Sequence, residues 1–98
     1  MSSTSVIVHN RAHWPGGNNA DLFIRAELVK DKSKISTAYA HSGEDAKLES
    51  ENLWYDLFVY DAEGEALLVG INGIYGDSKW DFVNDGAGYA LRKSEADR

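Results

Sequence analysis

The chain has 98 residues, of which 43% are hydrophobic and 11% aromatic. This length is typical of one domain with one core, and the composition differs from the low hydrophobicity of disordered chains. The formal charge is −6 at pH 7. An acidic surface repels phosphate backbones and anionic membranes, so we expect no nucleic-acid partner and no membrane anchor driven by charge. Sugars and neutral lipid headgroups remain open as ligands.

Two absences narrow the range of functions further. The sequence contains no cysteine, which excludes disulfides, thiolate nucleophiles and cysteine-based zinc sites. Residues 1–5 have neither a basic region nor a long apolar stretch, and no 18 apolar residues run together. We therefore expect a protein made without an export signal or transmembrane segment, either cytoplasmic or released by a non-classical route.

The first half of the chain alternates strand patterns with turn-forming residues. Residues 4–9 hold a β-branched run, and residues 13–19 are rich in glycine, asparagine and proline, so a strand followed by a loop is predicted. Residues 22–28 place apolar side chains at every second position, which is typical of a half-buried strand. Residues 34–42 continue this alternation, so the two runs should form an antiparallel hairpin around residues 31–33.

The segment from Ser42 to Asn52 gives a mixed signal. Ser42 followed by Asp45 resembles a helix capping box, and Ala46 and Leu48 are the apolar residues of the segment. We therefore expect a short surface helix near residues 43–51.

The second half carries the two most hydrophobic stretches, residues 53–60 and 66–71. The acidic turn between them ends on Gly64, which predicts a central hairpin. Shorter strands are expected around residues 80–83 and 89–92. Short strands at this spacing predict an all-β fold, a small antiparallel β-sandwich or barrel, formed by one domain over residues 1–98 with flexible tips at 1–4 and 94–98.

Metal binding has weak support in the sequence. His9 and His13 have the spacing of two ligands on a helix, but Pro15 and the β-branched run before them disfavour a helix, and no third ligand is evident. Two acidic sets, Asp61 with Glu63 and Glu65 and Asp77 with Asp81 and Asp85, do not match the calcium-binding loop. We expect solvated turns there and no metal or cofactor.

Catalysis also has weak support. Sixteen acidic residues make some suitably spaced carboxylate pair a matter of chance, and no Gly-x-Ser-x-Gly elbow occurs. Gly70, Gly73 and Gly76 are spaced by three, but no helix follows to bind a phosphate. We expect a non-enzymatic protein.

Residues 70–80, GINGIYGDSKW, form the richest candidate site. We expect them to form a short loop that places Asn72, Tyr75 and Trp80, with Asp81 following, near the end of the central hairpin. Aromatic faces beside polar groups suit a sugar ring or a choline-type headgroup. The alternative is that Trp80 covers a small core, since indole buries a large apolar area with one N–H to satisfy.

The stretch from Leu57 to Val83, LFVYDAEGEALLVGINGIYGDSKWDFV, resembles the middle segment of the fungal fruit-body lectins. These lectins share an actinoporin-like β-sandwich with the sea-anemone cytolysins, and the aegerolysins have a related pattern. The resemblance implies that Asn72 and Tyr75 belong to a sugar-binding loop and that Trp80 and Asp81 match the tryptophan and the polar residue after it. It covers about a quarter of the chain. The family continues further after the tryptophan than the eighteen residues that remain here, so we expect a shorter sandwich, whose open edge strands a second copy could cover.

Three functions follow as hypotheses. The first is a lectin-like module that binds a glycan or neutral lipid headgroup through residues 70–81. The second is an acidic immunity or inhibitor protein that captures a basic protein partner through its charge. The third is a structural subunit of a homo-oligomer, suggested by the two very apolar strands.

Overall fold

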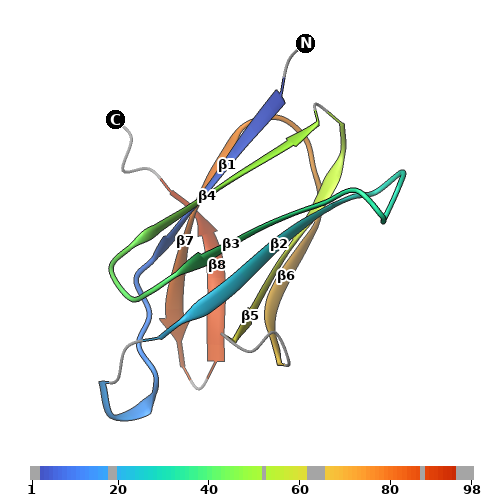
Figure 1. The fold of residues 1–98 in the computed structure, drawn as a ribbon. Helices are drawn as coiled ribbons and strands as arrows, with labels where there is room; N and C mark the ends of the chain where they lie inside the picture. Colours follow the sequence, from blue (N-terminus) through green and yellow to red (C-terminus); the bar gives the residue numbers. More distant parts are fainter. Residues whose placement is uncertain (1–2, 18–19, 52, 62–65, 87, 95–98) are drawn as a thin grey trace.

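Eight strands form two four-stranded sheets that pack face to face as a β-sandwich (Figure 1). The computed structural model describes residues 3–17, 20–51, 53–61, 66–86 and 88–94. A single 3₁₀ turn, η1 (Pro15–Gly17), follows the first strand. The strands are β1 (Ser3–Asn10), β2 (Leu22–Leu28), β3 (Ile35–Ala40), β4 (Asp45–Glu51), β5 (Tyr55–Asp61), β6 (Leu67–Ile74), β7 (Ser78–Asp85) and β8 (Gly88–Lys93).

The strand order is β4-β1-β7-β8 in one sheet and β3-β2-β5-β6 in the other. The predicted all-β sandwich is confirmed, and so is the antiparallel hairpin of β2 and β3. Every other pair is antiparallel as well, except that β1 and β7 run parallel. The pairing of β1 with β7 could not be predicted from the sequence, because most of the chain, and not a local turn, connects these two strands.

The core lies between the sheets, where alternating side chains of both sheets meet. Leu22 and Ile24 of β2 are fully buried, whereas Phe23 between them and Arg25 after them face outwards and are partly exposed. Tyr55 and Phe82 are the largest fully buried side chains. Thr4 belongs to the tip that was predicted to be flexible, yet it is buried in β1 and pairs with Ser50 of β4. Residues 1–2 and 95–98 of the predicted tips lie outside the described residues.

The prediction of a surface helix near residues 43–51 is wrong, because this segment is strand β4. Ala46 and Leu48 are buried while Lys47 and Glu49 are exposed, which is the period of two expected for a strand on a core. Ser42 caps no helix. Its hydroxyl donates to the carbonyl oxygen of Ala12 (2.8 Å) and accepts from the backbone N–H of Ala20 (2.5 Å).

The prediction that residues 70–80 form a loop is also wrong for most of these residues. Strand β6 continues to Ile74 and β7 starts at Ser78, so residues 75–77 alone connect them. The length of β6 could not be predicted from the sequence, because a bulge interrupts the alternation of its side chains. At this bulge, Asn72 and Gly73 together lie opposite Asp56 of β5. Gly73 has a φ of 73°, a conformation that glycine adopts without steric cost.

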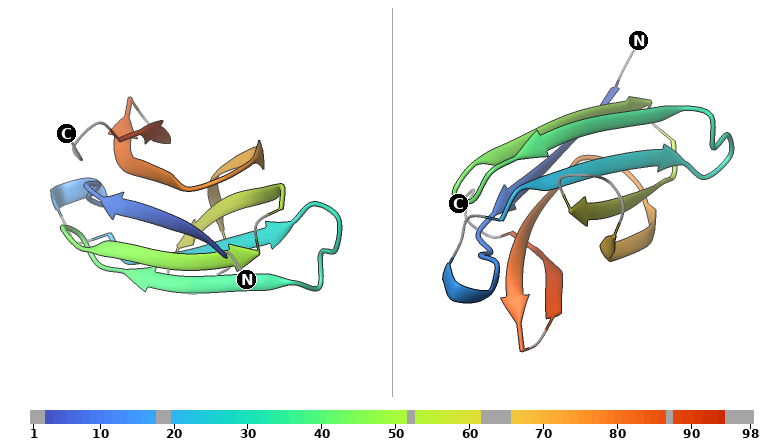
Figure 2. Two further views of the ribbon diagram at one scale, coloured as in Figure 1. Left: turned by 90° about the horizontal axis from the view of Figure 1, so that it is seen from above. Right: turned by 60° about the horizontal axis from the view of Figure 1, so that its bottom comes forward.

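The connections between strands gather at two ends of the sandwich (Figure 1). The β2–β3, β4–β5 and β6–β7 connections lie towards one end. The segment that includes η1 and the β7–β8 turn lies at the other end. Figure 2 shows that β3 and β4, the edge strands of different sheets, run side by side. Within the described part of the chain no helix is long and apolar enough to cross a bilayer.

Candidate functional site

Trp80 points into the core. It is 6% exposed and shares the inner face of β7 with Phe82. Its indole N–H donates to the hydroxyl oxygen of Ser78 at 2.8 Å, and the ammonium of Lys93 lies 5.8 Å from the ring centroid. The indole is therefore buried with its one donor satisfied, as the core alternative in the sequence analysis required.

The Ser78 hydroxyl extends this contact to β5. It lies 2.8 Å from the hydroxyl oxygen of Tyr55, which donates in turn to the carbonyl oxygen of Gly76 at 3.1 Å. Burial raises the pKa of the Tyr55 hydroxyl above its ordinary value. The chain of contacts from Trp80 to Gly76 ties the start of β7 and the β6–β7 connection to the core.

Asp81 lies on the other face of the sheet from Trp80, because consecutive strand residues point in opposite directions. The guanidinium Nε of Arg11 is 3.3 Å from a carboxylate oxygen of Asp81. The structure thus separates two of the four predicted site residues, and Trp80 and Asp81 do not line the same surface.

Tyr75 is exposed and has an aromatic neighbour that the sequence analysis missed. Its side chain is 54% exposed, and its ring centroid lies 5.3 Å from that of Trp54, which is 56% exposed. Trp54 was assigned to the strand of the central hairpin, yet it precedes β5. The fourth predicted residue, Asn72, is exposed in the bulge of β6.

Two exposed aliphatic residues lie in connections at the same end of the sandwich as this aromatic pair. Val29 follows β2, and its backbone N–H donates to the carbonyl oxygen of Trp54 at 3.0 Å. Leu53 precedes Trp54 in the chain, and both Val29 and Leu53 are exposed. We call Val29, Leu53, Trp54 and Tyr75 the aromatic end. Its residues come from the β2–β3, β4–β5 and β6–β7 connections, which lie at one end of the sandwich.

Asp56 fastens the backbone beneath the aromatic end. One of its carboxylate oxygens accepts the N–H of Gly73 in the bulge (2.9 Å), and the other lies 3.1 Å from the ammonium of Lys32 in the β2–β3 connection. Glu27 is the residue directly opposite Asp56 in the sheet, and it pairs with Arg25. Both carboxylates are buried, and each has a basic partner, as buried charges require.

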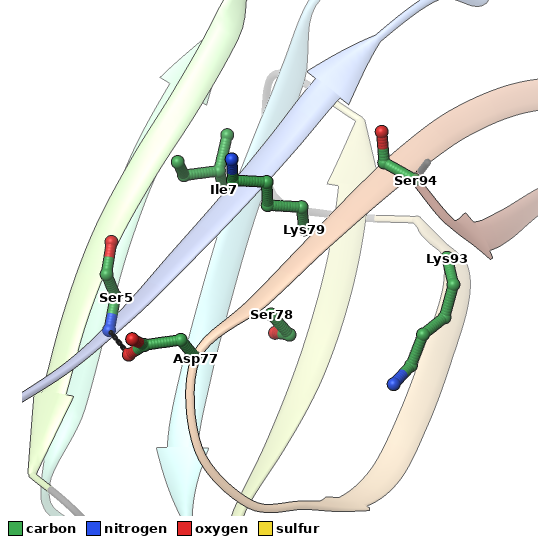
Figure 3. Close-up of a pocket in the computed structure, with 7 residues that line it drawn as sticks. All are labelled: Ser5, Ile7, Asp77, Ser78, Lys79, Lys93 and Ser94. Atoms are coloured by element: carbon green, nitrogen blue, oxygen red, sulfur yellow. Dashed lines mark hydrogen bonds between the residues drawn. The ribbon is translucent and has the colours of Figure 1, made fainter. Parts of the chain in front are cut away.

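A pocket of about 290 Å³ lies beside the first residues of β7 (Figure 3). Its side chains come from β1, from the start of β7 and from the end of β8, and Asp77 accepts the backbone N–H of Ser5 at 2.9 Å. The described residues lining it include two lysines and three serines but no aromatic side chain: Ser5, Ile7, Asp77, Ser78, Lys79, Lys93 and Ser94. It lacks the aromatic face that a sugar ring or choline group needs.

The histidines and acidic residues weighed for metals are dispersed. His9 contacts Asp45, and the acids Asp77, Asp81 and Asp85 contact Ser5, Arg11 and Arg92 respectively. Glu63 and Glu65 of the other acidic set lie outside the described residues. Across the described ranges, no three histidine, aspartate or glutamate residues form a group that could hold a metal ion.

No protein-family model and no curated protein matches the sequence. The resemblance to the fungal fruit-body lectins therefore stays a prediction.

Proposed function

We propose that this chain is a non-enzymatic module that binds neutral, choline-type lipid headgroups at a membrane surface through its aromatic end. The observation that carries the proposal is the exposed pair of Trp54 and Tyr75, whose ring centroids are 5.3 Å apart. Aromatic faces attract a trimethylammonium group electrostatically, and tryptophan and tyrosine favour the boundary between headgroups and acyl chains.

Val29 and Leu53 add to this proposal. Both side chains are exposed and lie in connections at the same end as the aromatic pair. This end therefore presents further apolar surface, which is unfavourable in water and favourable in a lipid interface. The three connections that carry the four side chains come together at one end of the sandwich (Figure 1). They can therefore approach a flat surface at the same time.

The charge distribution favours zwitterionic over anionic lipid. The β2–β3 connection holds three lysines, but Lys32 pairs with Asp56 and Lys34 pairs with Glu51. The chain as a whole carries −6, which opposes approach to an anionic surface. A headgroup without net charge avoids that cost.

Vesicle sedimentation tests the proposal directly. Wild-type protein should co-sediment with phosphatidylcholine vesicles and bind less to vesicles rich in phosphatidylglycerol. Tyr75→Ala and Trp54→Ala should each lower the bound fraction several-fold, because each removes one of the two rings. Tyr39→Ala is the matched control, since Tyr39 is 67% exposed but lies on β3, outside the aromatic end.

Two results would overturn the proposal. One is the absence of wild-type binding to phosphatidylcholine vesicles at any lipid concentration tested. The other is an equal loss of binding in Tyr39→Ala and Tyr75→Ala, which would show that the aromatic end has no special part in binding.

A second candidate function, assembly with another copy of the chain, is favoured by the outer face of the β3-β2-β5-β6 sheet. Tyr39, Phe23 and Tyr60 form a row across three strands, with ring centroids 5.0 and 6.1 Å apart. Phe58 lies next to Tyr60 on the same strand, β5, at 6.4 Å. Such a face suits a protein partner, since aromatic residues are enriched in interfaces. Light scattering tests this candidate: a dimer in the wild type should dissociate in Tyr39→Glu, and a wild-type monomer at high concentration would remove it.

A further inference from the structure

A second pocket, of about 360 Å³, lies at the end of the sandwich away from the aromatic end. Its lining residues come from the segment that includes η1 and from the β7–β8 hairpin, and both of these segments lie at that end (Figure 1). The described residues lining it are His13, Trp14, Gly17, Asn84, Gly86, Gly88 and Tyr89. Its size is near the lower limit for small-molecule sites, about 300 Å³, so it suits a small ligand.

One wall of this pocket is aromatic and is fixed to the core. Trp14 packs edge-on against Tyr89, with ring centroids 5.6 Å apart and the planes at 82°. Tyr89 in turn stacks on Phe82 at 5.3 Å, and Phe82 is fully buried. Trp14 is only partly buried, so its indole has surface that a ligand can contact. Its packing against Tyr89 fixes the position of the ring.

Asn84 fixes the segment opposite β7. Its side-chain N–H donates to the carbonyl oxygen of His13 (3.0 Å), and its side-chain oxygen accepts the backbone N–H of the same residue (3.1 Å). The backbone N–H of Arg11 also donates to the carbonyl oxygen of Phe82 at 2.9 Å. The pocket is therefore formed before any ligand arrives, which lowers the entropy cost of binding.

The chemistry of the lining selects a neutral ligand. Among the described residues that form the pocket there is no aspartate, glutamate, lysine or arginine, although such residues make up 27% of the chain. The lining residues with a polar side-chain group are His13, Trp14, Asn84 and Tyr89, and the three glycines contribute backbone alone. These donors and acceptors beside an indole face match a ligand with hydroxyl groups on its rim and C–H groups on one face.

We infer that this pocket binds one pyranose ring of a neutral saccharide, with the ring packed on Trp14. This site is separate from the aromatic end, and it does not depend on lipid binding there. A protein that carried both would connect a membrane surface at one end with a glycan at the other.

The three tryptophans of the chain make the test specific, because each lies in a different environment. Trp14 lines the pocket, Trp54 belongs to the aromatic end, and Trp80 is buried. In ¹H–¹⁵N spectra of the ¹⁵N-labelled protein, their indole N–H groups give three signals. Titration with methyl glycosides of galactose, glucose, mannose and N-acetylglucosamine should shift the Trp14 signal with at least one of them and leave the Trp54 and Trp80 signals in place.

Trp14→Ala supplies a variant that removes the aromatic wall of the pocket. Trp14 is partly buried and its ring contacts Tyr89, so the fully buried side chains of the core keep their contacts with one another. The variant should keep the wild-type spectrum of the core and weaken the saccharide-induced shifts of the Gly86 and Gly88 backbone amides, which also line the pocket, at least ten-fold. Thr37→Val, which adds no bulk on exposed β3, is the matched control and should bind as the wild type does.

Several results would overturn the inference. One is the absence of a Trp14 shift with any of the four glycosides at about 100 mM, a concentration well above a dissociation constant of about 1 mM. The others are equal shifts of all three indoles and undiminished binding in a folded Trp14→Ala variant. Dodecylphosphocholine micelles separate the two sites: they should shift Trp54 and not Trp14. Loss of the micelle response alone would contradict the proposed function and leave the saccharide site standing.

Discussion

The indole N–H of Trp80 donates to the hydroxyl oxygen of Ser78 at 2.8 Å, and both residues belong to the first three positions of β7. This contact holds Trp80, which was a candidate ligand-binding residue, in the core. Trp80 closes the core beside Phe82, while the exposed aromatic surface is supplied by Trp54 and Tyr75 from neighbouring connections.

Ser78→Ala should lower the free energy of unfolding by about 1–3 kcal/mol, because the buried Trp80 donor loses its acceptor and Tyr55 loses a partner. Urea unfolding followed by tryptophan fluorescence measures the change. Thr37→Ala removes an exposed hydroxyl and should change stability by at most about 0.5 kcal/mol. Equal stability of the two variants would show that the Ser78 hydroxyl does not serve as the partner of Trp80.

Two glycines should respond in opposite directions to substitution by alanine. Gly73 has a φ of 73°, and no heavy atom lies within 4 Å of an added Cβ, so Gly73→Ala should cost about 1–2 kcal/mol through backbone strain alone. Gly88 has no positive φ and similar room, so Gly88→Ala should leave stability unchanged or raise it by about 0.4–1 kcal/mol. Thermal unfolding of both variants checks the sign. A Gly73→Ala variant as stable as the wild type would contradict the conformation of the bulge.

The strands could be predicted because their side chains alternate where one face is buried. Residues 22–28 show this directly, and the observed β2 has the same bounds. β4 shows the same alternation, with Ala46 and Leu48 inside, but its remaining residues are charged or polar. Charged residues at exposed strand positions resemble those of a surface helix, and a serine before them resembled a cap, so the interpretation failed there.

The candidate site could be predicted only in part, because side chains that meet at the aromatic end come from distant parts of the chain. Tyr75 was identified from its local sequence, but Trp54 is 21 positions away, and only the pairing of β5 with β6 brings the two together. The pocket beside Trp14 was missed for the same reason: Asn84 and Tyr89 reach it from the β7–β8 hairpin. Residue types predict chemistry, whereas long-range pairing decides which residues share a surface.

Asp56 should control the order of the bulge that precedes Tyr75. Asp56→Ala removes the acceptor of the Gly73 N–H and the partner of Lys32, so the Gly73 amide should exchange with solvent at least ten-fold faster. Hydrogen exchange followed by NMR measures this rate. Glu49→Ala is the control, because Glu49 is exposed on β4, and it should leave the Gly73 rate unchanged. Unaltered exchange in Asp56→Ala would contradict the role of its carboxylate.

The pair of His41 and Asp21 should make stability depend on pH near neutrality. The imidazole Nδ1 of His41 lies 2.6 Å from a carboxylate oxygen of Asp21, and this hydrogen bond, together with the charges of Asp21 and Glu44, raises the pKa of His41 above its ordinary value. A raised pKa means that the folded state binds the proton more tightly than the unfolded state does. The resulting stabilisation is complete below the unfolded pKa of about 6.5 and is lost as pH rises through the folded pKa.

NMR titration should give a His41 pKa above 6.5 in the wild type and a lower pKa in Asp21→Asn. The midpoint of thermal unfolding should also fall less between pH 6 and pH 8 in the variant than in the wild type. Both residues are exposed, so added salt should reduce the difference. A His41 pKa that is the same in both proteins would refute the pairing.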